Sequence, residues 1–329
     1  MRNAAMLLRS LRRLWNNRRM ARLQVLLAAL CFGTTGTAHA LGPDGASAVT
    51  VGAARIAVGA ALLLAVQWLA GRRAAAGGPA AAPRAPRPPW SRAPVVLGAL
   101  GVAGYQLCFF AAVKDTGVAV GTVVALGSAP ALAGIGGWLV NRHKPQRAWA
   151  AATALACAGV ALLALSGGAG GTDVSAPGVA LAVGAGASYA IFTLASKRLL
   201  DQGHHVEPVM ARLFGFGALL LAPVLIAGDT GWLTTTTGAA MALWLGAVPT
   251  ALAYILFASG LRHLPANDVA TLTLAEPVTA ALLGAIVLGE RPGATAVVGI
   301  IIILAGLAVL AAPRRKQTPG RVAVEVANA

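Results

Sequence analysis

Charged residues are scarce in this sequence, and acidic residues are the scarcest. Asp, Glu, Lys and Arg make up 11% of the 329 residues, with only 10 Asp and Glu, whereas a soluble domain carries about 25% charged residues. Apolar residues make up 57%. A surface that faces water cannot be built from so few charges, so a soluble globular protein is excluded. The hydrocarbon core of a membrane suits this composition, and it admits only helices and closed barrels.

Other absences exclude further classes. The three cysteines, Cys31, Cys108 and Cys157, are odd in number and lie inside apolar stretches, which excludes a disulfide framework. The sequence has no Gly-x-Ser-x-Gly, no His-Glu-x-x-His, no paired intramembrane aspartates and no phosphate loop, so we expect no enzyme and no cofactor. No ring of charges or filter loop indicates a channel. His204 and His205 with Glu207 lack further ligands nearby, so no metal site is predicted.

Apolar stretches of helical length dominate what remains. Each is roughly 20 residues long, which fits a membrane-spanning helix and not the ~10-residue alternating strand of a barrel. We therefore predict an all-α polytopic membrane protein with ten transmembrane helices. The predicted spans are 23–42, 47–70, 93–113, 118–140, 148–166, 177–196, 208–228, 238–260, 266–288 and 294–312.

The basic residues lie between these stretches in a strongly alternating way. The net charge of +16 could indicate nucleic-acid binding, but the basic residues do not gather on one domain face, so no nucleic-acid partner is expected. Of the 26 Lys and Arg, 22 fall at the termini and in alternate gaps, and the other gaps hold only Lys114 and Arg291. Cytoplasmic loops carry such an excess. Both termini, 1–22 and 313–329, are thus predicted to be cytoplasmic basic segments of a plasma-membrane protein.

The N-terminus admits two other interpretations. Its arginines, the apolar run and Ala38-His39-Ala40 are similar to a cleavable signal peptide, although 33–37 interrupts the run with Gly and Thr. Met20 is an alternative start, which would make residues 1–19 an unstructured or interfacial extension. The internal repeat described next favours keeping the first span.

The chain matches itself in two halves. At a shift of 157 residues, 54–56 matches 211–213 and Phe32 meets Tyr189; later the shift is 147, and Pro130 meets Pro277. The halves are predicted as 23–167 and 168–312. Each holds five spans, an odd number, so the second half must enter the membrane from the opposite side. Such inverted repeats are typical of secondary transporters, whose two related conformations alternate around a site between the halves.

Several short segments resemble a known family. They are 30–34, 54–58, 109–114, 129–130, 187–192, 274–278 and 288–292, and their order and spacing are similar to those of the ten-helix drug/metabolite transporter superfamily with two EamA repeats. This resemblance implies export or exchange of small metabolites such as amino acids, nucleobases or drugs. The family often has Trp where Phe32 stands, which can reshape the pocket. The family pattern seen at Glu290 also predicts a Glu at the matching position of the first half, but His143 stands there.

Polar and aromatic residues inside the spans are the candidate binding residues. Glu276 is the only carboxylate well within a span, and it precedes the helix-bending Pro277; it can bind a substrate amine or a coupled proton, or simply favour a helix start. The candidate cavity residues are Phe32, Thr34, Thr37, Tyr105, Tyr189, Tyr254 and Glu276.

Two arginines lie inside spans, where a charge is costly. Arg55 and Arg212 occupy matching positions of the two halves. Their symmetric placement favours a structural role for both. A cavity charge for an anionic group is the alternative.

We therefore predict a secondary transporter, most simply an exporter or exchanger of amino-acid-like or other small amphipathic solutes. A non-transporting structural membrane protein and an intramembrane enzyme are the alternatives. The expected partners are a small-molecule substrate and membrane lipid, and a coupled proton and a homodimer are left open.

Cysteine labelling tests the predicted topology. In a variant without native cysteines, Asp44→Cys or Asp229→Cys should react with an impermeant thiol reagent applied to intact cells. Arg87→Cys should react only after the cells are lysed. Labelling of position 87 in intact cells would contradict the topology.

Overall fold

The computed structural model describes residues 2–76, 88–142, 146–166 and 175–312, and within these ranges the chain is helical and has no strand. Ten helical segments are long and apolar enough to cross a membrane, which confirms the predicted fold class. The elements are α1 (Arg2–Ala40), α2 (Ala48–Ala76), α3 (Arg92–Asn141), α4 (Arg147–Ser166), α5 (Ala176–Asp201), α6 (Val206–Ala227), η1 (Gly231–Thr234), α7 (Thr236–Gly246), η2 (Ala247–Leu252), α8 (Ala253–Leu261), α9 (Ala266–Leu272), η3 (Thr273–Ala275), α10 (Glu276–Val287) and α11 (Ala294–Ala311).

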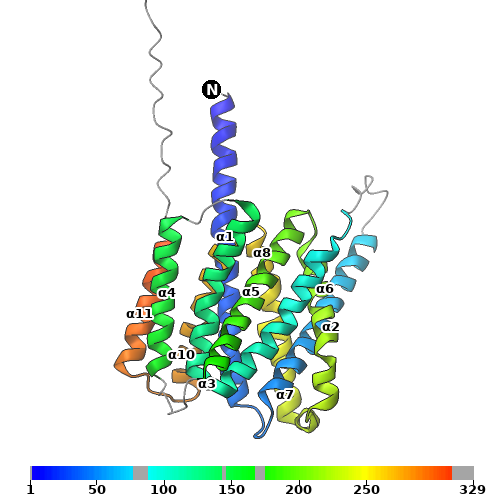
Figure 1. Ribbon diagram of the computed structural model, residues 1–329. Helices are drawn as coiled ribbons and strands as arrows, with labels where there is room; N and C mark the ends of the chain where they lie inside the picture. Colours follow the sequence, from blue (N-terminus) through cyan, green and yellow to red (C-terminus); the bar gives the residue numbers. More distant parts are fainter. Residues whose placement is uncertain (1, 77–87, 143–145, 167–174, 313–329) are drawn as a thin grey trace, which may run out of the picture.

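The helices stand side by side in one bundle (Figure 1). α4 and α11 form one edge of it, and α2, α6 and α7 form the other. We call the end of the bundle at which α2 and α5 finish and α3, α4 and α6 begin the basic end. It carries Arg72, Arg92, Arg142, Arg147, Arg198 and Arg262.

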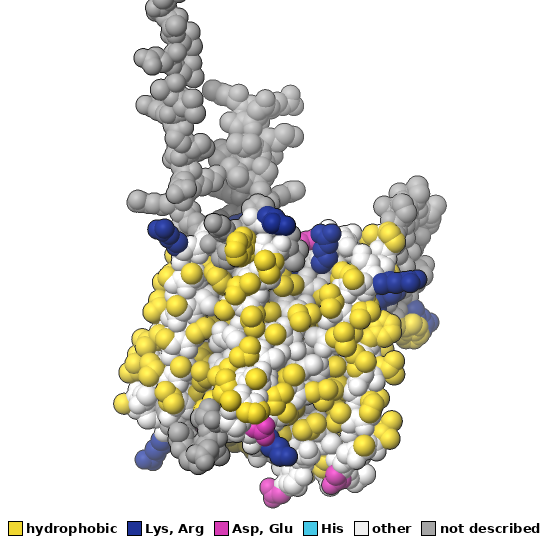
Figure 2. Space-filling view, in the orientation of Figure 1, with side chains coloured by type: hydrophobic (Ala, Val, Ile, Leu, Met, Phe, Trp, Pro, Cys, Tyr) yellow, Lys and Arg dark blue, Asp and Glu magenta, His cyan; other side chains and the backbone are white. Residues whose placement is uncertain are grey.

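The surface of the bundle is apolar, as a lipid-facing surface must be. Large aliphatic side chains project outward, with Ile226 84% and Ile286 78% exposed. In Figure 2 hydrophobic side chains cover the middle band, and most Lys and Arg lie towards the basic end. An ion pair between Nζ of Lys197 and Oδ1 of Asp201 (2.7 Å) lies at that end rather than within the band.

The predicted boundaries of the first two spans differ from the structure. α1 begins at Arg2 rather than near residue 23, because Ala, Leu and Arg favour helix and no Gly or Pro interrupts the chain before Gly33. α2 likewise continues to Ala76, into the loop predicted over 71–92; residues 77–87 of that loop lie outside the described residues.

The third and fourth spans join almost without a loop. α3 contains both of them, and only Gly117, with φ of 78°, leaves the helical conformation between them. A residue with a side chain rarely adopts this φ, so glycine makes the short turn possible.

Small residues bring α5 against the second half of α3. The predicted row of Gly178, Ala182, Gly186 and Ala190 is buried on this face. A methyl group at Gly186 would lie 2.8 Å from the backbone oxygen of Ala125, so the two backbones are in contact there. Close approach of this kind drives helix association in lipid, where apolar burial contributes little.

The α4–α11 pair is built in the same way. A methyl group at Gly159 would lie 2.6 Å from the oxygen of Gly299, and one at Gly306 would lie 2.8 Å from the oxygen of Ala152. The neighbours in both cases are backbone atoms, which cannot turn aside as a flexible side chain could. These glycines therefore set the distance between the two helices.

Gly159→Ala should destabilise the protein by pushing α4 from α11, by about 1–3 kcal/mol if the site behaves like other overpacked cores. A lower melting temperature in detergent is the expected result. Gly215→Ala is the matched control, because Gly215 is also helical and has open space where the methyl group would go. That control should melt no lower than the wild type, and equal melting temperatures for both variants would contradict the proposed contact.

Candidate functional site

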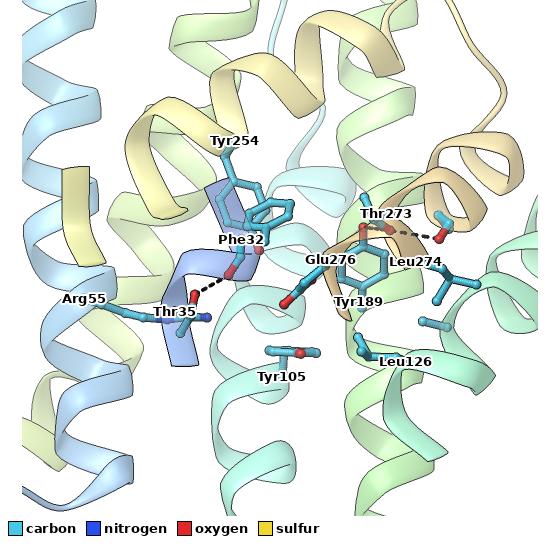
Figure 3. A pocket seen from close by; sticks show the side chains of 12 residues that line it. Phe32, Thr35, Arg55, Tyr105, Leu126, Tyr189, Tyr254, Thr273, Leu274 and Glu276 are labelled. Atoms are coloured by element: carbon cyan, nitrogen blue, oxygen red, sulfur yellow. Dashed lines mark hydrogen bonds between the residues drawn. The ribbon is translucent and has the colours of Figure 1, made fainter. Parts of the chain in front are cut away.

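A cavity lies in the middle of the bundle, between the two halves of the chain. The empty space in and around it is about 510 Å³, which includes open surroundings beyond its walls. Figure 3 shows its side chains converging from both halves. The lining residues are Phe32, Thr35, Arg55, Tyr105, Leu126, Ala129, Tyr189, Tyr254, Ala270, Thr273, Leu274 and Glu276.

A break in the ninth span places Glu276. α9 ends at Leu272, three residues form the tighter turn η3, and α10 restarts at Glu276 with Pro277 in its first turn. Proline lacks the backbone N–H that a continuous helix would need, and it fits the first turn of a new helix. The Thr273 hydroxyl donates to the oxygen of Ala270 (2.9 Å), which satisfies one carbonyl at the break. Glu276 therefore begins a helix halfway across the bundle.

A second irregular segment places Tyr254. The turn η2 between α7 and α8 is a wider π-helix and contains Pro249. The hydroxyl of Thr250 donates to the oxygen of Leu245 (2.8 Å), a carbonyl five residues earlier. Thr250 is fully buried and packs on Gly59 of α2. Turns of this kind often occur at functional sites, and here the turn ends two residues before a cavity side chain.

Aromatic rings fill the bundle beside Tyr254, on the side of the basic end. The ring centroids of Phe214, Phe192 and Phe257 lie 4.4, 5.4 and 5.9 Å from that of Tyr254. All three phenylalanines are at least 98% buried. These buried rings form an aromatic cluster beside Tyr254.

The cavity contains two opposite charges. Arg55 of α2 and Glu276 of α10 both line it and are both half-buried. Within the described part of the chain they form no ion pair with each other or with another residue. The Nε of Arg55 is buried without a hydrogen-bond partner. Charges without an ion-pair partner are costly in a protein interior.

Residues at matching positions of the two repeats line the cavity. Phe32 and Tyr189 match at the shift of 157, and Ala129 and Glu276 match at the shift of 147; all four line the cavity. Matching positions of the two halves thus form the cavity wall, but the side chains at those positions differ.

Most predicted cavity residues meet in this one place. Phe32, Tyr105, Tyr189, Tyr254 and Glu276 line it, and so does Arg55.

Thr34 and Thr37 do not line the cavity. The Thr34 hydroxyl donates to the oxygen of Cys31 (2.7 Å) and accepts a hydrogen bond from Nε1 of Trp244 (3.2 Å). Thr35 lines the cavity instead. It follows Phe32 by three residues and so shares its helix face, a signal in the sequence that could have selected it.

Arg212 lies apart from the cavity, near the basic end. Its guanidinium carbon lies 3.9 Å from the centroid of the Trp90 ring, and His204 stacks on that ring at the same distance. Burial lowers the pKa of His204; the positive charge of Arg212 lowers it further, while a hydrogen bond with the backbone of Pro89 opposes the shift. Arg55 and Arg212 therefore match in sequence but differ in surroundings.

Comparison with known proteins identifies the family. The model of the EamA-like transporter family matches residues 19–165 and again residues 176–312. The chain belongs to this family. The two matches correspond to the two halves of the chain, and the first includes the span that a signal-peptide interpretation would remove.

Relatives of this EamA-like transporter include the "Uncharacterized transporter YwfM" of Bacillus subtilis (strain 168). It is 40% identical over 295 residues, which cover 90% of this chain and 95% of that protein. An "Uncharacterized transporter" of Archaeoglobus fulgidus is 33% identical over 132 residues, 40% of this chain and 46% of its own. A solved crystal structure has the same fold, with a TM-score of 0.73, 21% identity and coverage of 88% of this chain and 95% of its own. The chain is thus a multi-pass membrane transporter.

Substitution should separate the two arginines. Arg212→Gln removes the cation from the Trp90 ring and should lower stability by about 0.5–2 kcal/mol, with transport per folded molecule retained. Arg55→Gln removes a charge that has no partner, so it should leave the melting temperature unchanged or raise it while transport falls at least tenfold. Thermal melting in detergent and uptake into proteoliposomes measure the two effects. Loss of stability with retained transport in Arg55→Gln would return Arg55 to a structural role.

Proposed function

We propose that this transporter is a secondary carrier that exports or exchanges a small metabolite by alternating access, and that the central cavity binds it. The substrate class is amino-acid-like or otherwise small and amphipathic. The observation that carries the proposal is the pair of opposite, unpaired charges, Arg55 and Glu276, facing one cavity between the two repeats. A solute with both an amine and a carboxylate can compensate both charges.

The aromatic cluster beside Tyr254 supports alternating access. In this proposal the buried rings of Phe192, Phe214 and Phe257 close the basic end, and the solute enters this conformation from the opposite end. Two repeats of opposite orientation provide a related conformation in which the closed end is exchanged. Membership of a transporter family likewise favours a carrier over an intramembrane enzyme or a structural protein.

The basic end is the cytoplasmic end in this proposal, with both termini on that side of the plasma membrane. The positive-inside distribution of Lys and Arg supports this orientation. Glu276 is the group available for a coupled proton, because a carboxyl can bind either a substrate cation or a proton. A homodimer is compatible with the exposed apolar faces and is not required for a cavity that one chain completes.

Counterflow in proteoliposomes tests the proposal. Vesicles loaded with a panel of unlabelled amino acids and other small metabolites should accumulate the labelled form of the substrate, which a channel or an enzyme cannot do. Glu276→Gln keeps the size and hydrogen bonding of the side chain and removes its charge. It should reduce counterflow at least tenfold and flatten any dependence of transport on pH.

Glu290→Gln is the matched control, because Glu290 is an exposed carboxylate outside the cavity. It should leave counterflow and its pH profile unchanged. Equal rates for Glu276→Gln and the wild type, with equal pH profiles, would contradict the role of Glu276. A failure of the whole panel to exchange would contradict the carrier function.

A further inference from the structure

The aromatic residues of the chain are unevenly placed. The sequence contains only three tyrosines, and Tyr105, Tyr189 and Tyr254 all line the cavity. Phe32 adds a fourth ring to the same wall. A transporter with an ordinary apolar site does not need all its tyrosines in the cavity. The question is which chemical group of a substrate the rings would contact.

These rings surround the carboxylate of Glu276. Figure 3 shows Glu276 among Tyr105, Tyr189 and the Phe32–Tyr254 pair, with Arg55 approaching from α2. The ring centroids of Tyr105 and Tyr189 are 6.3 Å apart, and those of Phe32 and Tyr254 are 4.9 Å apart. The faces of aromatic rings carry partial negative charge and attract cations. Rings and carboxylate therefore create negative potential at one place in the cavity.

Two of the hydroxyl donors that line the cavity are already engaged with the protein. The hydroxyl of Thr35 donates to the oxygen of Phe32, and that of Thr273 donates to the oxygen of Ala270 and meets the hydroxyl of Tyr189 at 3.1 Å. A primary ammonium has three N–H donors to satisfy and is strongly hydrated. An ammonium that carries methyl groups needs fewer acceptors, and its methyl groups gain from contact with the rings.

A second charged group of the cavity suits an anion. Arg55 presents a guanidinium whose Nε is buried without a partner, and a carboxylate is the group that guanidinium binds best. No ion pair joins Arg55 to Glu276 in the described part of the chain, so each charge can meet a group of a ligand.

From this arrangement we infer that the preferred substrates are compact zwitterions with an N-methylated ammonium group, which lies among the tyrosines at Glu276, and a carboxylate, which faces Arg55. This inference rests on the proposed transport function and specifies its substrate class. It separates betaine-type solutes from ordinary amino acids, whose primary ammonium would make weaker use of the rings.

A methylation series on the purified full-length protein tests it. Glycine, N-methylglycine, N,N-dimethylglycine and N,N,N-trimethylglycine keep the carboxylate constant and add one methyl group at a time. Binding measured by calorimetry should tighten along the series, by at least about tenfold from the first member to the last. Counterflow should favour the methylated members in the same order.

Ring variants show whether the aromatic wall causes the effect. Tyr105→Phe keeps the ring and should keep the gain from methylation, whatever happens to overall affinity. Tyr105→Leu removes the ring and should reduce that gain at least threefold, with a melting curve that establishes folding. Trp68→Leu is the control, because Trp68 is an exposed aromatic residue outside the cavity; it should leave the series unchanged.

The possible outcomes distinguish a failure of this inference from a failure of the proposed carrier function. Affinity that stays level or falls with methylation, while unmethylated amino acids still exchange, overturns the inference and leaves the carrier intact. A gain that survives in Tyr105→Leu overturns the role of that ring and with it the aromatic site. The absence of exchange for the whole metabolite panel overturns the proposed function and this inference together.

Discussion

Hydrocarbon offers a peptide group no hydrogen-bond partner, and this constraint shapes the whole bundle. Where the chain faces lipid, it stays in regular helix and satisfies its own backbone. The two irregular segments within spans, η2 and η3, are largely buried, and side chains supply partners there, as Thr250 does for the oxygen of Leu245. Both segments adjoin the cavity. The backbone leaves the α-helix where protein surrounds it, and those are the places that present the cavity residues Tyr254 and Glu276.

The same constraint explains what could be predicted from sequence. Lipid demands long apolar stretches, so the ten spans are visible in composition alone and the structure confirms them. Glu276 was identifiable because a carboxylate in such a stretch is rare. The limits of the two halves remain a prediction.

Other features depended on contacts between distant segments. The choice of Thr35 over Thr34 depends on how α1 is rotated against its neighbours, which the apolar pattern of a lipid-exposed helix fixes poorly. Arg55 and Arg212 share a sequence context, yet one faces the cavity and the other meets Trp90. Trp90 precedes α3 by two residues and lies more than 100 positions from both His204 and Arg212 in sequence, so no local pattern could reveal the cluster.

Pseudo-symmetry and chemistry follow different rules in the cavity. Matching positions of the two repeats line the cavity, so the backbone arrangement of the two halves is still related there. The residues at those positions have diverged: Ala129 is matched by the charged Glu276, and the helix that carries Ala129 has no break like η3. A duplicated fold can move symmetrically while it holds an asymmetric solute.

Arg55 belongs to the first repeat and Glu276 to the second, so each half of the molecule holds one charge of the pair. In the proposed alternating-access cycle, an empty cavity would carry two charges without ion-pair partners through its closed state, which would cost free energy. A solute with both charges would neutralise them and link the two halves. Its presence would lower the barrier to turnover, and the same two residues would thereby keep the unloaded protein from leaking.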